Sequence, residues 1–187
     1  MDAGFRERLI SSCRVFEGRL LAVQVDEVEL PGGTRAQREI VARHPGAAVI
    51  APLLPEGKVV MLRHYRHAAG KVLLELPAGI LNPGESPEEC AHRELIEETG
   101  YAAGKLRHLF SAYLSPGYSS ELAHFFLATG LRAQGTAPTE DEPVELVILP
   151  LAEAVAMVAR GEVQNAAAVC GLLAAARWGG EASGAIE

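Results

Sequence analysis

Three glutamates, Glu94, Glu97 and Glu98, stand close together in a stretch of helical character. A helix turns by about 100° per residue, so Glu94 and Glu98 overlay one turn apart and Glu97 lies beside them. Carboxylates at this separation repel one another, and a bound cation removes that penalty. Because oxygen ligands favour hard cations, the cluster predicts a site for Mg²⁺ or Mn²⁺ that shares its shell with water and substrate phosphates.

The acidic side of this helix is not purely polar, since Cys90 and Ala91 occupy the same side one turn earlier. A helix face turned to solvent would be polar throughout. The alternative interpretation is a surface helix rich in glutamate, which is what a lone pair of neighbouring glutamates usually indicates. Arg93 and the loop before the helix favour the metal site, because they complete a longer pattern.

That loop is punctuated by residues that end regular structure. An apolar run from Val72 to Leu76 has strand character, and Ala78-Gly79 ends it. Asn82-Pro83-Gly84 is a strong turn signal. The glutamates are therefore predicted to lie behind a loop that follows a strand.

Both ends of the helix carry capping signals. Ser86 suits the N-cap, Pro87 suits the first helical position, and Glu89 completes a capping box. Gly100 fits the left-handed residue after a helix end. We therefore predict a helix from about Pro87 to Thr99.

The stretch from Gly79 to Tyr101 resembles the Nudix box, G-x5-E-x7-R-E-U-x-E-E-x-G-U, where U is a bulky aliphatic residue. Every fixed residue of the box matches, and the sequence departs only at Tyr101, which stands at the last U, a packing position. The resemblance implies an α/β (α+β) Nudix fold, in which a mixed β-sheet is sandwiched between helices. It also implies a metal-dependent hydrolase.

Segments outside the box resemble the ADP-ribose pyrophosphatase group of that family. Pro116-Gly117 stands at the distance past the box that marks this group. Further similar segments are Arg63–Arg66, Glu75–Gly79, Arg38–Val41 and His44–Ala47. The resemblance covers roughly residues 15–175 and implies hydrolysis of ADP-ribose to AMP and ribose 5-phosphate, with Pro116 and Gly117 near the substrate.

The resemblance also assigns the metal ligands. Glu94 and Glu98, with Glu97 and the backbone carbonyl of Ala78, would hold two or three Mg²⁺ ions, with Mn²⁺ as the alternative. Such ions would neutralise the diphosphate and lower the pKa of an attacking water.

The acidic loop 139–143 would supply the base. By composition it is a solvated surface loop, but in the family that the chain resembles the matching loop closes over the site. Glu140 is expected to be the general base and Glu142 a further metal contact, and the order of these two stays open.

The remaining site residues are expected to orient groups or bind substrate. Arg93 would orient the glutamates by a salt bridge, with Glu85 in support. Arg38 and Arg66 are candidates for phosphate or ribose contacts, since Arg forms forked bonds to phosphate; for each, a surface ion pair is the alternative. The resemblance further implies that Glu75 hydrogen-bonds the adenine or ribose.

We predict three parts in the chain. Residues 1–44 form a small β unit, with alternating apolar residues from Arg19 to Leu30 and a returning strand from Arg38 to Arg43. Residues 45–178 form the catalytic domain, and residues 179–187 a flexible tail. A short hairpin cannot bury a core alone. The resemblance implies a homodimer in which the N-terminal unit helps to build the partner's substrate pocket.

The composition limits the classes of function. The 187 residues are 49% hydrophobic, and their formal net charge is −7. No basic patch or stripe appears in the sequence, which argues against nucleic acid as a partner. No apolar span is long enough for a membrane helix. Cys13, Cys90 and Cys170 are predicted to be small buried residues of a reducing cytoplasm.

Two other functions compete. One keeps the Nudix chemistry but changes the substrate to GDP-mannose, another nucleoside diphosphate sugar, or a dinucleotide. The other is a non-catalytic ADP-ribose sensor, a class that usually shows an eroded box or an added DNA-binding domain. The box is intact here, and residues 163–177 are rich in alanine with almost no basic residues.

Overall fold

The computed structural model describes residues 4–42, 45–135 and 143–179. The described chain divides into two compact units. We call residues 1–46 with 113–122 the N-terminal unit, and residues 47–112 with 123–187 the main unit. Residues 113–122 come from within the range 45–178 for which we expect a catalytic domain, and the roles expected of the two parts stay predictions.

The N-terminal unit is an antiparallel sheet in the order β1-β2-β3, formed by β1 (Arg8–Glu17), β2 (Ala22–Glu29) and β3 (Arg35–Val41). The sequence predicted the β2–β3 hairpin but not β1, whose residues are almost all exposed and follow no clear alternation. The segment 113–122 joins this unit where the Val41 amide donates to the Tyr118 carbonyl at 2.7 Å.

A mixed sheet forms the centre of the main unit. Its order is β12-β5-β4-β10-β9, with β6 paired to β5 and β7 paired to β4. Strands β4 and β10 are parallel, and β4–β5, β4–β7, β5–β6 and β5–β12 are antiparallel. The strands are β4 (Ala47–Leu54), β5 (Lys58–Arg66), β6 (Lys71–Glu75), β7 (Ala78–Ile80), β9 (Lys105–Tyr113), β10 (Leu122–Thr129) and β12 (Val144–Pro150), with a small pair of β8 (Tyr101–Ala102) and β11 (Arg132–Ala133).

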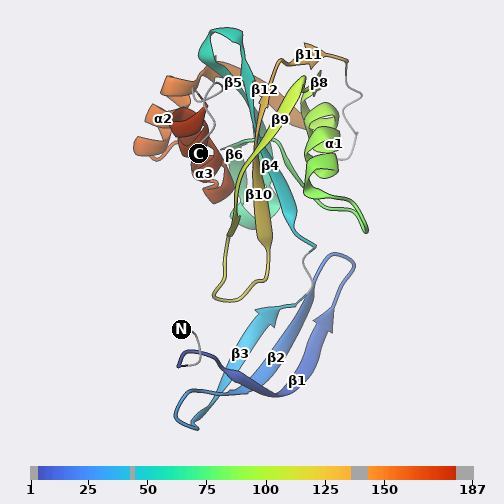
Figure 1. Ribbon diagram of the computed structural model, residues 1–187, viewed down its shortest axis with the longest axis vertical. Helices are drawn as coiled ribbons and strands as arrows, with labels where there is room; N and C mark the ends of the chain where they lie inside the picture. Colours follow the sequence, from blue (N-terminus) through green and yellow to red (C-terminus); the bar gives the residue numbers. More distant parts are fainter. Residues whose placement is uncertain (1–3, 43–44, 136–142, 180–187) are drawn as a thin grey trace, which may run out of the picture. The chain divides into compact units, whose positions relative to one another are not determined.

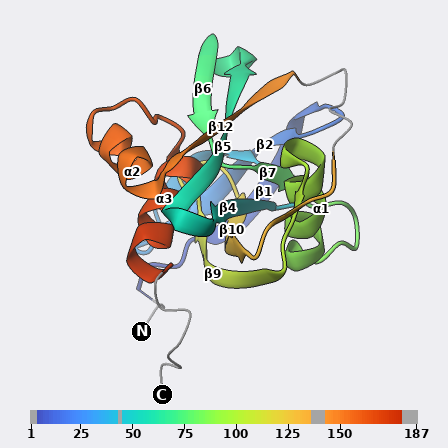
Figure 2. The same ribbon diagram turned by 90° about the horizontal axis from the view of Figure 1, so that it is seen from above.

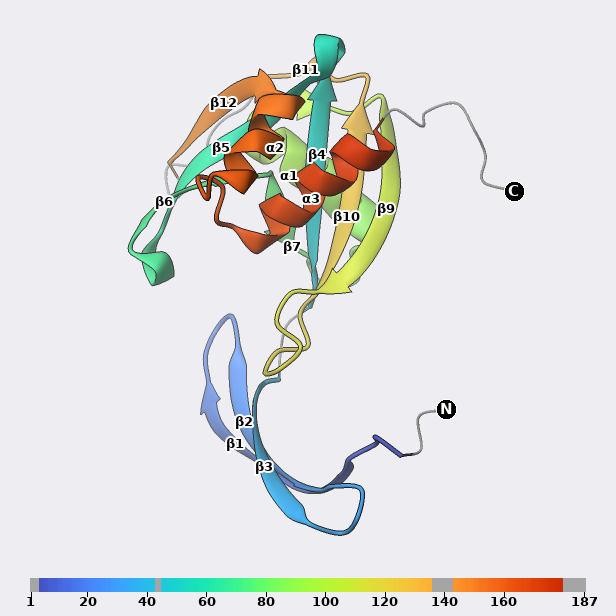
Figure 3. The ribbon, with the colours of Figure 1, turned by 90° about the vertical axis from the view of Figure 1, so that its left-hand side faces the viewer.

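Helices cover both faces of this sheet, as Figures 1 and 2 show: α1 (Pro87–Thr99) lies on one face, and α2 (Leu151–Ala159) and α3 (Ala166–Trp178) on the other. Strand β4 alternates between the two layers. Ala48 and Ile50 pack with α1, whereas Val49 lies near Gly171 of α3. Figure 3 shows α3 crossing β4 and β10. The predicted fold of a mixed sheet between helices is confirmed.

Helix α1 begins and ends where the capping signals predicted. The Ser86 side chain accepts from the Glu89 amide, the Glu89 carboxylate accepts from the Ser86 amide, and Gly100 is left-handed with φ 73°. Helix α3 starts at Ala166, where the Asn165 side chain caps the helix by accepting from the Ala168 amide. Among the described residues, no helix is long and apolar enough to cross a membrane.

The cysteine prediction is wrong in part. Cys90, on the inner side of α1, is fully buried, but Cys13 and Cys170 are exposed. Cys13 lies on β1, whose side chains have little cover within the N-terminal unit, and Cys170 lies on the outer side of α3.

Candidate active site

The site begins where β7 leaves room for a carboxylate. Strand β7 pairs with β4, which places Gly79 opposite Ala48 and Ala78 opposite Val49. A β-carbon on Gly79 would lie 1.9 Å from both Cδ and Oε1 of Glu94. The Glu94 carboxylate therefore lies against the Gly79 backbone, in space that any residue other than glycine would fill.

Glu98 reaches the neighbouring residue of the same strand. Its Oε2 accepts a hydrogen bond from the Ala78 amide at 2.8 Å. Glu94 and Glu98 are one turn apart on α1, so the helix delivers both carboxylates to the consecutive backbone units of Ala78 and Gly79. The geometry explains why a glycine follows Ala78 at the start of the acidic pattern.

Arg93 ties the glutamates of the loop and the helix together. Its Nε and Nη2 form a fork to both oxygens of Glu85, at 2.8 and 2.9 Å. Its Nη1 donates to Glu94 at 2.5 Å and to Glu97 at 3.1 Å, and Nη2 also reaches the Ile80 carbonyl at 3.2 Å. One guanidinium thus fixes the orientation of three carboxylates and of the loop before the helix.

The charges of the site shift its ionisation. Arg93, together with the Asn82 amide, lowers the pKa of Glu85 to about 2. Burial raises the pKa of Glu94, and Arg93 opposes that shift. The three carboxylates in turn raise the pKa of Arg93. Glu94 is therefore a desolvated carboxylate whose charged form depends on a cation beside it.

These residues fit a partial metal shell rather than a complete cage. Within residues 4–42, 45–135 and 143–179, no group of three or more His, Cys, Asp and Glu side chains is placed to hold a metal ion. Mg²⁺ is usually bound by one or two carboxylates and completes its shell with water and substrate phosphates. Glu94 and Glu98, gathered at Ala78–Gly79, supply that kind of donor set, while Glu97 is half exposed and bonded to Arg93.

Arg66 and Glu75 contact each other. Glu75 is 3% exposed, and its carboxylate accepts from Nε and Nη2 of Arg66 at 2.9 and 2.7 Å. It also accepts from Nδ2 of Asn165 at 2.9 Å. Hydrogen-bond capacity that we expected Glu75 to offer to a substrate is thus used within the protein.

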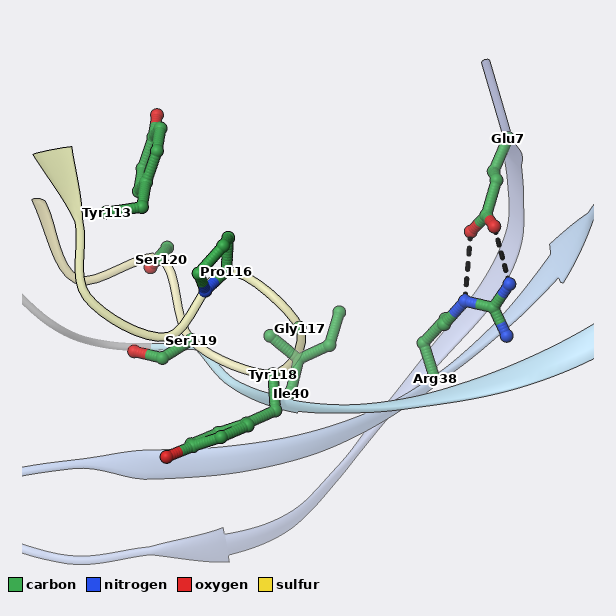
Figure 4. A pocket seen from close by; sticks show the side chains of 9 residues that line it. All are labelled: Glu7, Arg38, Ile40, Tyr113, Pro116, Gly117, Tyr118, Ser119 and Ser120. Atoms are coloured by element: carbon green, nitrogen blue, oxygen red, sulfur yellow. Dashed lines mark hydrogen bonds and ion pairs between the residues drawn. The ribbon is translucent and has the colours of Figure 1, made fainter. Parts of the chain in front are cut away.

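Arg38, Pro116 and Gly117 line one pocket of about 580 Å³ in the N-terminal unit. Figure 4 shows Arg38 facing Glu7, with the 116–120 loop lining the other part of the pocket beside Tyr113. Glu7 accepts from Nε of Arg38 at 3.1 Å and from Nη2 at 2.5 Å. This ion pair raises the pKa of Arg38. The structure thus brings together these predicted substrate-binding residues and pairs Arg38 with an acid.

Sequence reasoning missed Asn165 and Glu7. The bond from Asn165 to Glu75 joins residues 90 positions apart and leaves no local pattern in the sequence. Glu7 carries no signal at all. The predicted base Glu140 and metal contact Glu142 lie outside the described residues, so the structure gives them no position.

Residues 42–169 match the protein-family model of the NUDIX domain. A methanol dehydrogenase activator of Bacillus methanolicus is 41% identical over 167 residues, which cover 88% of this chain and 90% of the relative. An ADP-ribose pyrophosphatase of Bacillus subtilis (strain 168) is 40% identical over 162 residues, covering 86% and 87%. A GDP-mannose pyrophosphatase of Citrobacter koseri is 39% identical over 140 residues, covering 70% and 73%.

Solved structures show the same relationship. A crystal structure of an ADP compounds hydrolase aligns with a TM-score of 0.85 at 26% identity, covering 95% of this chain and 96% of that chain. The match to the family spans most of the chain, includes the whole of the acidic helix and its loop, and agrees with the observed fold. The protein therefore belongs to the NUDIX-domain family and is a Nudix hydrolase.

Proposed function

We propose that the protein hydrolyses the pyrophosphate bond of ADP-ribose and releases AMP and ribose 5-phosphate. The observation that carries this proposal is the delivery of Glu94 and Glu98 by one helix to the adjacent backbone of Ala78 and Gly79. The ADP-ribose pyrophosphatase of Bacillus subtilis and the ADP compounds hydrolase structure support the choice of substrate.

Nudix hydrolases generally need divalent metal ions. For this chain we propose two or three Mg²⁺ ions, with Mn²⁺ as a substitute, held by Glu94, Glu98, Glu97 and the Ala78 carbonyl. When bound, such ions neutralise a diphosphate and lower the pKa of a coordinated water. Hydrolysis of a diphosphate needs both effects, because its negative charges repel an attacking hydroxide.

The chain's own residues position these groups. Arg93 holds Glu85, Glu94 and Glu97 in one network, so the carboxylates do not have to reorganise when substrate enters. The Ala78 amide fixes the rotamer of Glu98 through its hydrogen bond. Arg93 and Glu85 are therefore proposed as orienting residues of the catalytic centre.

The base and the substrate contacts complete the proposal. We propose that Glu140 accepts the proton of the attacking water and that Glu142 contributes to the metal site, with the reverse order as the alternative. Arg38, Pro116 and Gly117 are proposed to contact the substrate in the pocket of the N-terminal unit. Arg66, whose side chain is 42% exposed, is proposed as a phosphate or ribose contact that is oriented by Glu75.

We further propose that the protein is cytoplasmic and forms a homodimer in which residues 1–44 contribute to the partner's substrate pocket. Large apolar side chains of that segment are exposed, among them Phe5 at 86%, Val15 at 58% and Phe16 at 56%. Exposed apolar surface of this extent favours burial against another chain.

A hydrolysis panel tests the substrate. Purified protein with Mg²⁺ is given ADP-ribose, GDP-mannose and a dinucleotide, and the products are identified by ion-exchange chromatography. The proposal predicts the highest kcat/KM for ADP-ribose, with AMP and ribose 5-phosphate in equal amounts. A preference for GDP-mannose would support the alternative substrate, as the Citrobacter koseri relative suggests, and tight binding of ADP-ribose without turnover would indicate a sensor.

A further inference from the structure

We propose that Asn165, at the N-terminus of α3, is a positioning residue of the catalytic centre that acts through Glu75 on the segment 76–79. The inference deepens the proposed function and rests on it. It assigns a role in catalysis to a helix on the opposite face of the sheet from the acidic helix.

Asn165 makes two hydrogen bonds that need both ends of an amide. Its Oδ1 accepts from the Ala168 amide at 2.9 Å and so caps α3. Its Nδ2 donates to Oε1 of Glu75 at 2.9 Å. Asp or Ser could also cap the helix, but Asp has no donor and Ser is too short to keep the bond to Glu75. The dual contact therefore selects asparagine.

Glu75 needs its partners because it is buried. Only 3% of the residue is exposed, and its carboxylate accepts from Arg66 as well as from Asn165. A buried carboxylate is tolerated only when its charge is paired and its oxygens are hydrogen-bonded. Loss of the Asn165 donor would thus leave one Glu75 oxygen short of a hydrogen bond and favour a shift of the carboxylate.

A displacement of Glu75 would pass directly into the site. Glu75 is the last residue of β6, and the chain continues through Leu76 and Pro77 to Ala78. Leu76 is buried, and the Pro77 carbonyl accepts from the Ile50 amide at 2.9 Å, so this short segment has little freedom. The next amide, that of Ala78, holds Glu98.

Both ends of β6 are tied to the segment before α3. Lys71, the first residue of β6, donates to Oε1 of Gln164 at 2.5 Å, and Glu75, the last, accepts from Asn165. Two adjacent residues thus bind the two ends of the strand that leads into the site, in addition to its pairing with β5. The Lys71 bond is exposed and the Glu75 bond is partly buried, so the second is the stronger constraint.

The test compares Asn165→Asp with Gln164→Glu. Each adds one negative charge at neighbouring positions, but only the first removes the donor to Glu75 and sets a carboxylate against it. Asn165→Asp is expected to lower kcat for ADP-ribose about tenfold or more with KM within about threefold, because small displacements of a catalytic group are costly. Gln164→Glu keeps an acceptor for Lys71 and should stay within about twofold of wild type. Asn165→Ser, which adds no charge, should change kcat in the same direction by less.

A second readout does not depend on turnover. Hydrogen exchange at the Ala78 amide, followed by NMR, should be at least about tenfold faster in Asn165→Asp than in wild type, because the amide loses its fixed alignment with Glu98. If wild type fails to hydrolyse ADP-ribose, the proposed function falls while this measurement still judges the inference. Wild-type kcat together with wild-type exchange at Ala78 in Asn165→Asp would overturn the inference.

The pair Asn165→Asp and Glu75→Gln separates positioning from general destabilisation. The double variant exchanges donor and acceptor between the two positions, so an amide faces a carboxylate again. The fold-loss of kcat in the double variant should be smaller than the product of the two single fold-losses, which is the mark of two residues that act together. Losses that simply multiply would show that Asn165 acts apart from Glu75 and would also overturn the inference.

Discussion

Glu94 occupies the space that a side chain on Gly79 would fill, 1.9 Å from the β-carbon that any other residue would carry there. Helix α1 and strand β7 therefore pack so closely at this point that only glycine fits at position 79. This relationship makes the glycine a part of the proposed catalytic centre, and the first prediction depends on it.

Gly79→Ala should displace the Glu94 carboxylate and lower kcat about a hundredfold, since a misplacement of about 1 Å can cost that much. Steady-state hydrolysis of ADP-ribose measures the effect. Gly84→Ala is the control in the same loop: Gly84 has φ 81° but meets nothing within 4 Å. That variant should lose stability through backbone strain and keep its kcat. Equal kcat values for Gly79→Ala and wild type would show that hydrolysis does not require the Glu94 carboxylate in its observed position.

Glu98→Gln should lower turnover more than about a hundredfold, because it removes a charged oxygen from the proposed metal shell while keeping the shape of the side chain. Titration with Mn²⁺, followed by electron paramagnetic resonance, should show weaker binding. Glu88→Gln, on the exposed first turn of the same helix, is the matched control and should behave as wild type. Undiminished AMP release by Glu98→Gln would show that the metal site is misassigned.

Glu85 should make the free energy of unfolding depend on pH in the acid range. Its pKa is lowered from 4.5 to about 2 in the folded protein by Arg93 and the Asn82 amide. A carboxylate with a depressed folded pKa contributes stability that is fully present above pH 4.5 and is lost as the pH falls towards 2. Urea unfolding between pH 5 and 2 should therefore show a steeper loss for wild type than for Glu85→Gln. Parallel curves would contradict the ion pair.

Arg38→Ala should raise KM for ADP-ribose about tenfold with little change in kcat, if this guanidinium binds the substrate's phosphates or ribose. Glu7→Gln should lower KM, because Glu7 now holds the fork of Arg38 and an anionic substrate must compete with it. Arg35→Ala is the control, since Arg35 is paired with Glu27 on the same sheet and lies outside the pocket. An unchanged KM for Arg38→Ala would remove Arg38 from the substrate pocket.

The acidic helix could be predicted from sequence because its signals are local. Ser86, Glu89 and Gly100 mark its ends within three residues of each boundary, and Arg93 stands among the glutamates that it binds. The box marked Gly79 as a fixed glycine, but the reason for it, a Glu94 carboxylate against the Gly79 backbone, needed the structure.

What the sequence did not reveal depends on distant pairings. Glu75 binds Asn165, 90 residues away in the sequence, and Arg38 binds Glu7, 31 residues away. Neither contact produces a helical or strand periodicity by which it could be recognised. Strand β1 escaped prediction because almost all of its residues are exposed, which erases the alternation by which a half-buried strand is recognised.

The central claim is that Glu94 and Glu98 hold divalent cations against the diphosphate of the substrate. The most direct test is anomalous diffraction from crystals grown with Mn²⁺ and an ADP-ribose analogue whose bridging oxygen is replaced by a methylene group, which prevents hydrolysis. We expect manganese peaks within direct coordination distance of carboxylate oxygens of Glu94 and Glu98, next to the bridged phosphates. Peaks elsewhere, with both side chains turned away from the analogue, would contradict it.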